Sequence, residues 1–203
     1  MTGGWPGHLA YALAWASFGL GHSLLARDRV KDRLRPWLGA WYRLAYNGFA
    51  VVHIAAVWLF GRWLLGDAPA YALPEPVRLA LYGVQGLGAV ILLVGLTGYD
   101  LGRFGGLAQV RNHRRGVTAP EDEPLRVDGL HRYVRHPLYL GGLLLLWGNV
   151  RDPFSLATAV WGSLYLGIGT WFEERSLLRR YGRAYADYRA RVPAVVPWRG
   201  RAI

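Results

Sequence analysis

Two groups of polar residues in the C-terminal half of the chain carry side chains that could bind a charged small molecule. The turn RYVRHPLYLGG, residues 132–142, carries Arg135 and His136 directly before a long hydrophobic run, and the pair Glu173 and Glu174 follows that run. Guanidinium and imidazole groups donate hydrogen bonds to a carboxylate, and a Glu carboxylate accepts them from an ammonium group. These types together indicate a site for a zwitterion, although arginines beside a glutamate also form simple surface ion pairs.

The elements that must position these residues are long apolar runs. The 203 residues are 53% hydrophobic and include ten Trp, yet the net charge is +11. A bilayer core of about 30 Å needs about 20 apolar residues per helix. Five runs meet or approach this requirement: residues 5–26, 44–65, 77–99, 137–150 and 153–172. The fourth run is short, and only two residues separate it from the fifth, which indicates a helical hairpin. We predict an all-α fold, a polytopic membrane bundle of about five transmembrane helices.

The basic residues are grouped on alternate loops of this arrangement. Six lie in residues 27–43, seven in 103–135 and eight in 175–201, while only three lie in the other loops. By the positive-inside rule the basic loops are cytoplasmic. We therefore predict an integral protein of the bacterial inner membrane, with the N-terminus outside and the C-terminus cytoplasmic. The first run lacks a basic n-region and a convincing cleavage site, which indicates a retained span. The grouping favours membrane lipids as partners and disfavours nucleic acid.

The last part of the chain has the pattern of an amphipathic helix. Apolar and aromatic residues recur there at helical spacing, at Leu177, Tyr181, Tyr185, Tyr188 and Val192. We therefore expect a single helix after the fifth span, with these residues on one face. The helix would lie at the cytoplasmic interface or pack on the loop before the turn.

Glycines in the apolar runs indicate close contact between helices. They are Gly86, Gly88, Gly95 and Gly98 in the third run, and Gly162, Gly167 and Gly169 in the fifth. We expect one membrane domain over residues 1–203. Residues 1–99 would hold three spans, and residues 100–203 the loop, the hairpin and the C-terminal helix.

Cysteine is absent, which excludes disulfides, thiolate metal sites and a cysteine nucleophile. The predicted spans contain His8, His22 and His53. Intramembrane histidines can ligate haem or relay protons, but a histidine hydrogen-bonded within the bundle, or lining a substrate pocket, is the simpler interpretation. No metal site is predicted.

The turn and the segment after the hairpin carry a resemblance to a known group of enzymes. LRVDGLHRYVRHPLYLGG, followed by EERSLLRRYGRAYADYRARVPAVVPW, resembles the C-terminal signature of the isoprenylcysteine carboxyl methyltransferases and the related phospholipid methyltransferases. The matching pattern is Arg-His-Pro-x-Tyr-x-Gly, a hydrophobic hairpin, Glu-Glu, then Gly-x-x-Tyr-x-x-Tyr, within residues 121–198. The N-terminal half, with FGLGHSLLARDRVK and WYRLAYNGFAVVH, is similar to methanethiol S-methyltransferases and NnrU-type membrane proteins.

The resemblance implies a methyltransferase that uses S-adenosyl-L-methionine, bound between the loop, the hairpin and the C-terminal helix. The cofactor-binding residues that it implies are Glu123, Pro124, Leu125, Arg126, His131, Arg135, His136, Pro137, Leu138, Tyr139 and Glu173. Glu174 is expected to face solvent or an arginine of the C-terminal helix. No catalytic residue is assigned, since holding donor and acceptor in line in a dry site can supply most of the acceleration.

Two positions depart from the pattern of the resembled enzymes. A Tyr usually stands where this chain has His131, and prenylcysteine enzymes have a carboxylate-binding Arg where it has Gly169. The predicted acceptor is therefore a small or lipidic apolar molecule reached from the bilayer, with a thiol first and a phospholipid amine or a carboxylate next. The alternative is a non-enzymatic membrane protein, either haem-binding or accessory to respiratory nitrogen metabolism.

Overall fold

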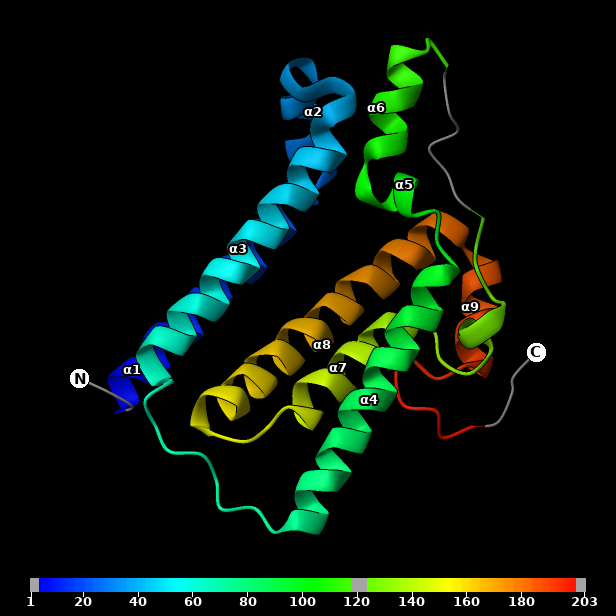
Figure 1. Cartoon of the computed structure of the whole chain (residues 1–203). Helices are drawn as coiled ribbons and strands as arrows, with labels where there is room; N and C mark the ends of the chain where they lie inside the picture. The colour runs from blue at the N-terminus through cyan, green and yellow to red at the C-terminus, as the bar shows by residue number, and fades with distance from the viewer. Residues whose placement is uncertain (1–3, 118–123, 200–203) are drawn as a thin grey trace. The chain divides into compact units, whose positions relative to one another are not determined.

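The computed structural model of the chain describes residues 4–117 and 124–199, and this part is helical without strands (Figure 1). The elements in chain order are α1 (Trp5–Leu25), α2 (Asp28–Leu38), η1 (Gly39–Trp41), α3 (Tyr42–Leu65), α4 (Glu75–Thr97), α5 (Leu101–Gly105), α6 (Leu107–Arg114), η2 (Gly129–Arg132), α7 (Pro137–Gly148), α8 (Pro153–Tyr181) and α9 (Arg183–Arg191). The predicted all-α class is confirmed.

Each of the five predicted spans coincides with a helix: α1, α3, α4, α7 and α8. By length and hydropathy, two helical stretches of the described chain are able to cross a membrane, Asp28–Leu65 and Glu75–Thr97, and α7 is a shorter apolar helix. Membrane-capable helices are therefore present, and the arrangement with five spans stays a prediction.

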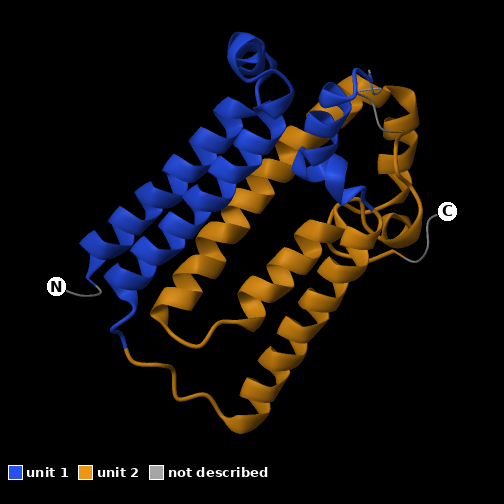
Figure 2. Ribbon diagram, turned by 45° about the horizontal axis from the view of Figure 1, so that its top comes forward, with its two compact units in different colours: residues 1–68, 99–122 blue, residues 69–98, 123–203 orange. Residues whose placement is uncertain are grey.

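The chain divides into two compact units (Figure 2). Unit 1 comprises residues 1–68 and 99–122, and unit 2 comprises residues 69–98 and 123–203. The helix α4, which was expected to group with the N-terminal spans, belongs to unit 2 and packs on α7. Close backbone contact joins α4 to this helix, which lies far along the chain.

In unit 1, α1 and α3 pack through aromatic rings. Tyr11 is fully buried and lies against Gly61 of α3, where a Cβ atom would clash with its ring. Trp15 makes edge contacts with Tyr11 and with Phe18, each with ring centroids 6.3 Å apart. Edge-to-face packing of this kind adds to the free energy that burial supplies.

Two of the histidines in the predicted spans lie at this same α1–α3 contact. The Nε2 atom of His22 is 2.6 Å from the hydroxyl oxygen of Tyr46, and that of His53 is 3.2 Å from the hydroxyl oxygen of Ser17. Both imidazole rings also contact the ring of Phe18. These are the contacts expected of histidines that are hydrogen-bonded within a bundle.

In unit 2, α4 and α7 approach through their backbones. A Cβ atom on Gly88 would lie 2.7 Å from the Leu145 amide nitrogen and 2.8 Å from the Gly141 carbonyl oxygen. Gly148 of α7 similarly lies against the backbone of Gln85. Such contacts require glycine at Gly88 and Gly148, because a side chain there would meet the backbone of the other helix, and small residues associate helices in lipid in this way.

The predicted role of the glycines is therefore right for some and wrong for others. Gly88 and Gly95 are buried, and Gly95 lies against the side chain of Leu138. At Gly86, Gly167 and Gly169 no atom of the described structure lies within 4 Å of an added Cβ. Sequence spacing alone does not tell which side of a helix faces its neighbour.

The helix α8 is longer than the predicted fifth span. It begins with a capping box between Asp152 and Ser155. It then continues through the acidic pair to Tyr181, because the residues after Phe172 are mostly strong helix formers. It ends at Gly182, whose φ of +54° favours glycine.

The prediction of a single amphipathic helix after the fifth span is therefore wrong. The first half of that segment is the end of α8, and only its second half forms the separate helix α9. Its expected packing is nevertheless confirmed. Tyr185, Tyr188 and Val192 form a buried cluster against Leu125 and Val127, which belong to the loop before the turn.

Candidate functional site

The two neighbouring carboxylates of α8 have different surroundings. The side chain of Glu173 is 43% exposed, whereas that of Glu174 is 10% exposed. Successive side chains on a helix point about 100° apart, so adjacent residues face different neighbours. Of the two alternatives expected for Glu174, exposure to solvent is wrong, and contact with an arginine of the C-terminal helix is confirmed by Arg189 of α9.

Glu174 accepts hydrogen bonds from several side chains. Its Oε1 atom accepts from Nε of Arg135 at 2.7 Å and also from Nη2 of the same guanidinium. The Nε2 atom of His136 and the hydroxyl of Tyr185 are each 3.2 Å from Oε1, and Nε of Arg189 is 3.3 Å from Oε2. Burial acts to raise the pKa of Glu174, but the hydrogen bonds and charge of Arg135, together with the hydrogen bond of His136, outweigh it and lower the pKa. The buried carboxylate is therefore ionised at neutral pH.

Arg135 is directed toward partners inside the protein. Its Nη1 atom donates to the carbonyl oxygens of Arg189, at 3.2 Å, and of Val192. The backbone amides of Arg135 and of the residue after it donate to the carbonyls of Pro193 and Ala194, both at 2.9 Å. With its side chain only 8% exposed, this guanidinium ties the turn to the end of α9.

Glu173 belongs to a more open group at the start of α7. The Tyr139 hydroxyl donates to Oε2 of Glu173 at 2.6 Å. The ring of His136 stacks on the ring of Tyr139, with centroids 5.3 Å apart and an angle of 10° between the planes. The Nδ1 atom of His136 lies 3.6 Å from Oε2 of Glu173. A carboxylate beside an aromatic face is an arrangement that attracts a cation.

The loop before the turn supplies a further cation. The Nε atom of Arg126 lies 3.3 Å from Asp128, and the Arg126 side chain is 38% exposed. Its guanidinium rests on Gly98 at the end of α4, where an added Cβ would be 2.7 Å from Nη1. The glycine leaves the room in which this guanidinium lies.

His131 lies in η2 between the loop and the turn. Its Nδ1 atom is 3.1 Å from the carbonyl oxygen of Arg135, and its own carbonyl accepts from the Tyr188 hydroxyl at 2.6 Å. Burial lowers the pKa of His131, and the charge of Arg126 acts in the same direction. His131 is therefore neutral at neutral pH, and its hydrogen bonds join η2 to α9.

The structure sorts the predicted cofactor residues into three groups. Glu123 lies outside the described residues. Three of the others take part in internal packing or hydrogen bonds, namely Leu125, Arg135 and Pro137. Leu138 packs on α4, and Pro124 is exposed. His136, Tyr139 and Glu173 contact one another at the start of α7, and Arg126 lies near enough to His131 to influence its pKa.

Glu174 was predicted as a member of the acidic pair but not as its buried one, and its partners Tyr185 and Arg189 were not predicted by name. The sequence shows both glutamates of the pair as equivalent, and only the rotational phase of α8 distinguishes them. Tyr185 did carry a signal, because it lies on the apolar face predicted for the C-terminal helix.

The membrane-capable helices, and the charged cluster near the start of α7, are the features that comparison with known proteins has to explain. No family model matches the chain, and no solved structure matches it. Curated relatives do match, and they span most of the sequence. Methanethiol S-methyltransferase 2 of Bradyrhizobium diazoefficiens is 31% identical over 193 residues, which are 93% of this chain and 73% of the relative. Methanethiol S-methyltransferase of Mycobacterium tuberculosis is 28% identical over 189 residues, 89% of this chain and 74% of the relative.

A shorter match joins the chain to a second group. Protein-S-isoprenylcysteine O-methyltransferase of Schizosaccharomyces pombe is 34% identical over 83 residues, 38% of this chain and 34% of the relative. The chain belongs to the methanethiol S-methyltransferase family, within the membrane methyltransferases that resemble the isoprenylcysteine enzymes. It is an enzyme of the methyltransferase class, and the predicted resemblance is confirmed.

Proposed function

We propose that this enzyme transfers a methyl group from S-adenosyl-L-methionine to a small hydrophobic thiol. The observation that carries the cofactor assignment is the half-exposed carboxylate of Glu173 beside the stacked rings of His136 and Tyr139. The thiol is supported by the relatives named methanethiol S-methyltransferase. It is also supported by Gly169, which stands where the resembled prenylcysteine enzymes have a carboxylate-binding arginine.

The residues of unit 2 fit the amino-acid end of this cofactor. Its ammonium group would be held by Glu173 and the faces of the neighbouring rings, because a carboxylate and a π-system both attract a cation. Its carboxylate would be held by Arg126, because the guanidinium of Arg135 is turned inward. When bound, the cofactor supplies an electrophilic methyl group on a sulfonium.

The protein's own contribution to the reaction is positioning. The attacking species is the thiolate, so the acceptor itself is the nucleophile and the chain needs none. Holding the two reactants in line, and keeping water away from them, lowers the barrier without a catalytic triad or a metal ion.

Titration calorimetry with S-adenosylhomocysteine tests the cofactor assignment. Glu173→Gln keeps the size of the side chain but removes its charge. Losing a charge-assisted contact of this kind typically costs about 2–5 kcal/mol. Since about 1.4 kcal/mol is a factor of ten, affinity should fall by roughly 30-fold or more.

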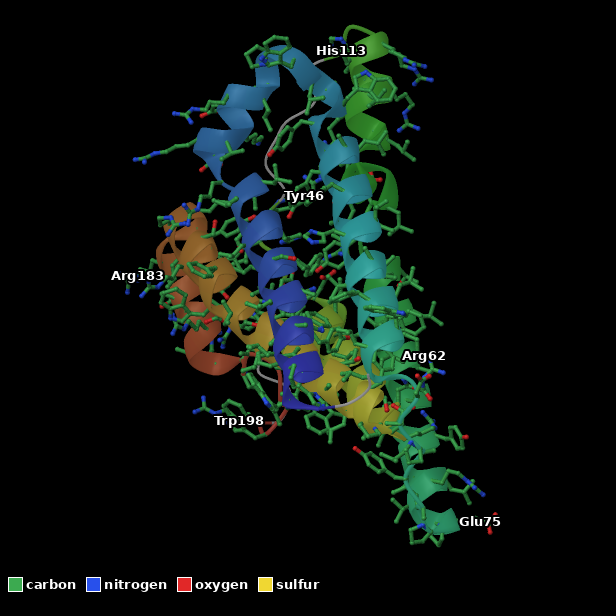
Figure 3. The ribbon with its side chains drawn as sticks, turned by 90° about the vertical axis from the view of Figure 1, so that its left-hand side faces the viewer. Tyr46, Arg62, Glu75, His113, Arg183 and Trp198 are labelled. Atoms are coloured by element: carbon green, nitrogen blue, oxygen red, sulfur yellow. The ribbon has the colours of Figure 1, made fainter. Side chains whose placement is uncertain are left out.

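The matched control is Glu75→Gln, which removes an exposed carboxylate from the first turn of α4, where it projects outward (Figure 3). It should bind like the unmodified protein. Unchanged affinity in a well-folded Glu173→Gln protein would remove Glu173 from the site.

The identity of the acceptor is tested by comparing how fast different acceptor molecules become labelled. Membranes supplied with radiolabelled cofactor should methylate a small hydrophobic thiol faster than a farnesylcysteine analogue or phosphatidylethanolamine. Faster labelling of the farnesylcysteine compound would show that another residue replaces the arginine missing at Gly169. Faster labelling of the phospholipid would move the assignment to an amine acceptor.

We also propose that the loops rich in arginine face the cytoplasm of a bacterial inner membrane, as the distribution of basic residues favours. Reporter fusions after Arg35, Arg115 and Arg199 should all report cytoplasm, and one after Asp67 should report the outside. An external signal from the Arg115 fusion would contradict the common orientation of these loops.

A further inference from the structure

The proposed function assigns no cofactor contact to the buried carboxylate of Glu174. This carboxylate nevertheless makes more polar contacts than its exposed neighbour, Glu173. We propose that Glu174 is a positioning residue that keeps the imidazole proton of His136 on Nε2, and thereby presents Nδ1 as a second acceptor, beside Glu173, for the ammonium group of the ligand. This inference rests on the proposed function, because it concerns the same site.

The first step concerns the proton between Glu174 and His136. The carboxylate is buried and receives the guanidinium of Arg135, so it is ionised and can only accept hydrogen bonds. The Nε2 atom of His136 lies 3.2 Å from its Oε1 atom. A hydrogen bond at that contact requires the hydrogen on Nε2.

The second step concerns the other ring nitrogen. An imidazole that carries one hydrogen, on Nε2, has a lone pair on Nδ1. Nδ1 is 3.6 Å from Oε2 of Glu173, beyond the usual length of a hydrogen bond. Two acceptors then face one another at a distance that a single ammonium, with its three N–H donors, can bridge. Stacking on Tyr139 holds the ring plane of His136 in this orientation.

The third step concerns what holds Glu174 itself. Its partners come from the turn, at Arg135, and from α9, at Tyr185 and Arg189. The position of the carboxylate is therefore determined from both sides, and it varies little with the state of the ligand site. Partners of this kind behind a ligand-binding histidine fix its tautomer and orientation in many proteins.

Glu174→Gln separates this role from a simple loss of structure. The amide can donate to Nε2 of His136, which allows the hydrogen to move to Nδ1 and to pair with Glu173 directly. That internal pair would compete with an ammonium ligand. We expect the affinity for S-adenosylhomocysteine to fall at least tenfold in Glu174→Gln, while Glu174→Asp, which keeps the charge, recovers part of it.

The tautomer can be observed directly by nitrogen NMR of the protein labelled with ¹⁵N-histidine. The chain has six His residues, and a His136→Gln sample assigns the relevant signal by its absence. In the unmodified protein without ligand, His136 should show the tautomer with hydrogen on Nε2. In Glu174→Gln this signal should move toward the other tautomer.

The outcomes of these measurements distinguish the inference from the proposed function. A wild-type His136 with its hydrogen on Nδ1 overturns the positioning role, and so does an unchanged tautomer in folded Glu174→Gln. Failure of the unmodified protein to bind S-adenosylhomocysteine overturns the cofactor assignment instead. The NMR measurement on unmodified protein decides the question even if Glu174→Gln does not fold.

Discussion

The two units hold their apolar helices together in different ways. In unit 1, α1 and α3 meet through the ring of Tyr11, which lies against Gly61, and through the side-chain hydrogen bond between His22 and Tyr46. In unit 2, α4 and α7 meet backbone to backbone at Gly88 and Gly141. Lipid tails are as apolar as the helix surfaces, so burial alone does not drive helix association in a membrane. Each pair therefore needs close packing or a polar contact, and the two units rely on these to different degrees.

A second difference is electrostatic. Unit 2 contains a buried carboxylate, Glu174, that joins α8 to the turn and to α9. In unit 1 the polar contacts between α1 and α3 are those of histidine, tyrosine and serine side chains. The structure of unit 2 thus depends on an ionised group, and this difference gives the largest expected effect.

Acid should open the C-terminal part of unit 2 first. The folded pKa of Glu174 is below its ordinary value of 4.5, so its contribution to stability is complete above that pH and is lost as the pH falls through the lowered pKa. Protonation would leave the Arg135 guanidinium buried without a counterion, and breaking a buried pair typically costs about 3–5 kcal/mol.

Hydrogen–deuterium exchange, corrected for the intrinsic effect of pH, should show this opening below pH 4.5 in residues 183–192 and in the turn. Residues 44–65 of unit 1 should exchange as they do at neutral pH. Simultaneous opening of both segments would show that the buried carboxylate does not distinguish the units.

Adding one methyl group to Gly88 should destabilise unit 2. In Gly88→Ala the new Cβ would lie 2.7 Å from a backbone nitrogen, and a backbone cannot rotate out of the way. Overpacking typically costs about 1–3 kcal/mol of unfolding free energy, which unfolding in mixed micelles can measure.

The control is Gly86→Ala, on the same helix with open space at its Cβ position. It should be neutral or should stabilise by up to about 1 kcal/mol, because alanine is the better helix former. Equal losses in the two variants would mean that the glycine contact does not hold α4 to α7.

The corresponding change in unit 1 should cost less than Gly88→Ala. In Gly61→Ala the new methyl group meets the ring of Tyr11, and a ring can shift where a backbone cannot. We expect a loss of about 1 kcal/mol, at the low end of overpacking costs. Comparison of the two variants in the same unfolding assay checks the order, and a larger loss for Gly61→Ala would reverse the distinction between the units.

Removing a single hydroxyl from unit 1 should have the smallest effect. Tyr46→Phe loses the 2.6 Å contact with His22. Hydrogen bonds between helices in membranes average about 0.6 kcal/mol and reach about 1.7. Unfolding free energies of Tyr46→Phe and of the loop control Tyr71→Phe should therefore differ by less than about 2 kcal/mol. A larger difference would make polar contacts the main attachment of α1 to α3.

Much of the fold could be predicted because it depends on local composition. The apolar runs placed all five long helices within a few residues, and Pro137 at the first position of α7 marked the start of that helix. The end of α8 was not predicted, because the polar residues after Phe172 mark the end of an apolar surface but are good helix formers. Hydropathy therefore located the apolar part of the helix, and Gly182 located its end.

The site could be predicted in its residues but not in their arrangement. The motif around Arg135 and His136, and the acidic pair, were recognised from their types and order. Which of Glu173 and Glu174 is buried, and that Arg135 turns inward toward Val192, were not recognised.

The sequence by itself determined the helical class, the methyltransferase family and the chemical types that gather at the end of the hairpin. These follow from periodicity, hydropathy and motif order, which are properties of neighbouring residues. Tertiary structure alone decided that α4 pairs with α7, that Gly88 rather than Gly86 makes the contact, and that Glu174 is the inner carboxylate. Each of these depends on how one helix is rotated about its axis against another. Adjacent residues on a helix point about 100° apart, so the rotation decides which of two residues that look equivalent in the sequence faces the partner.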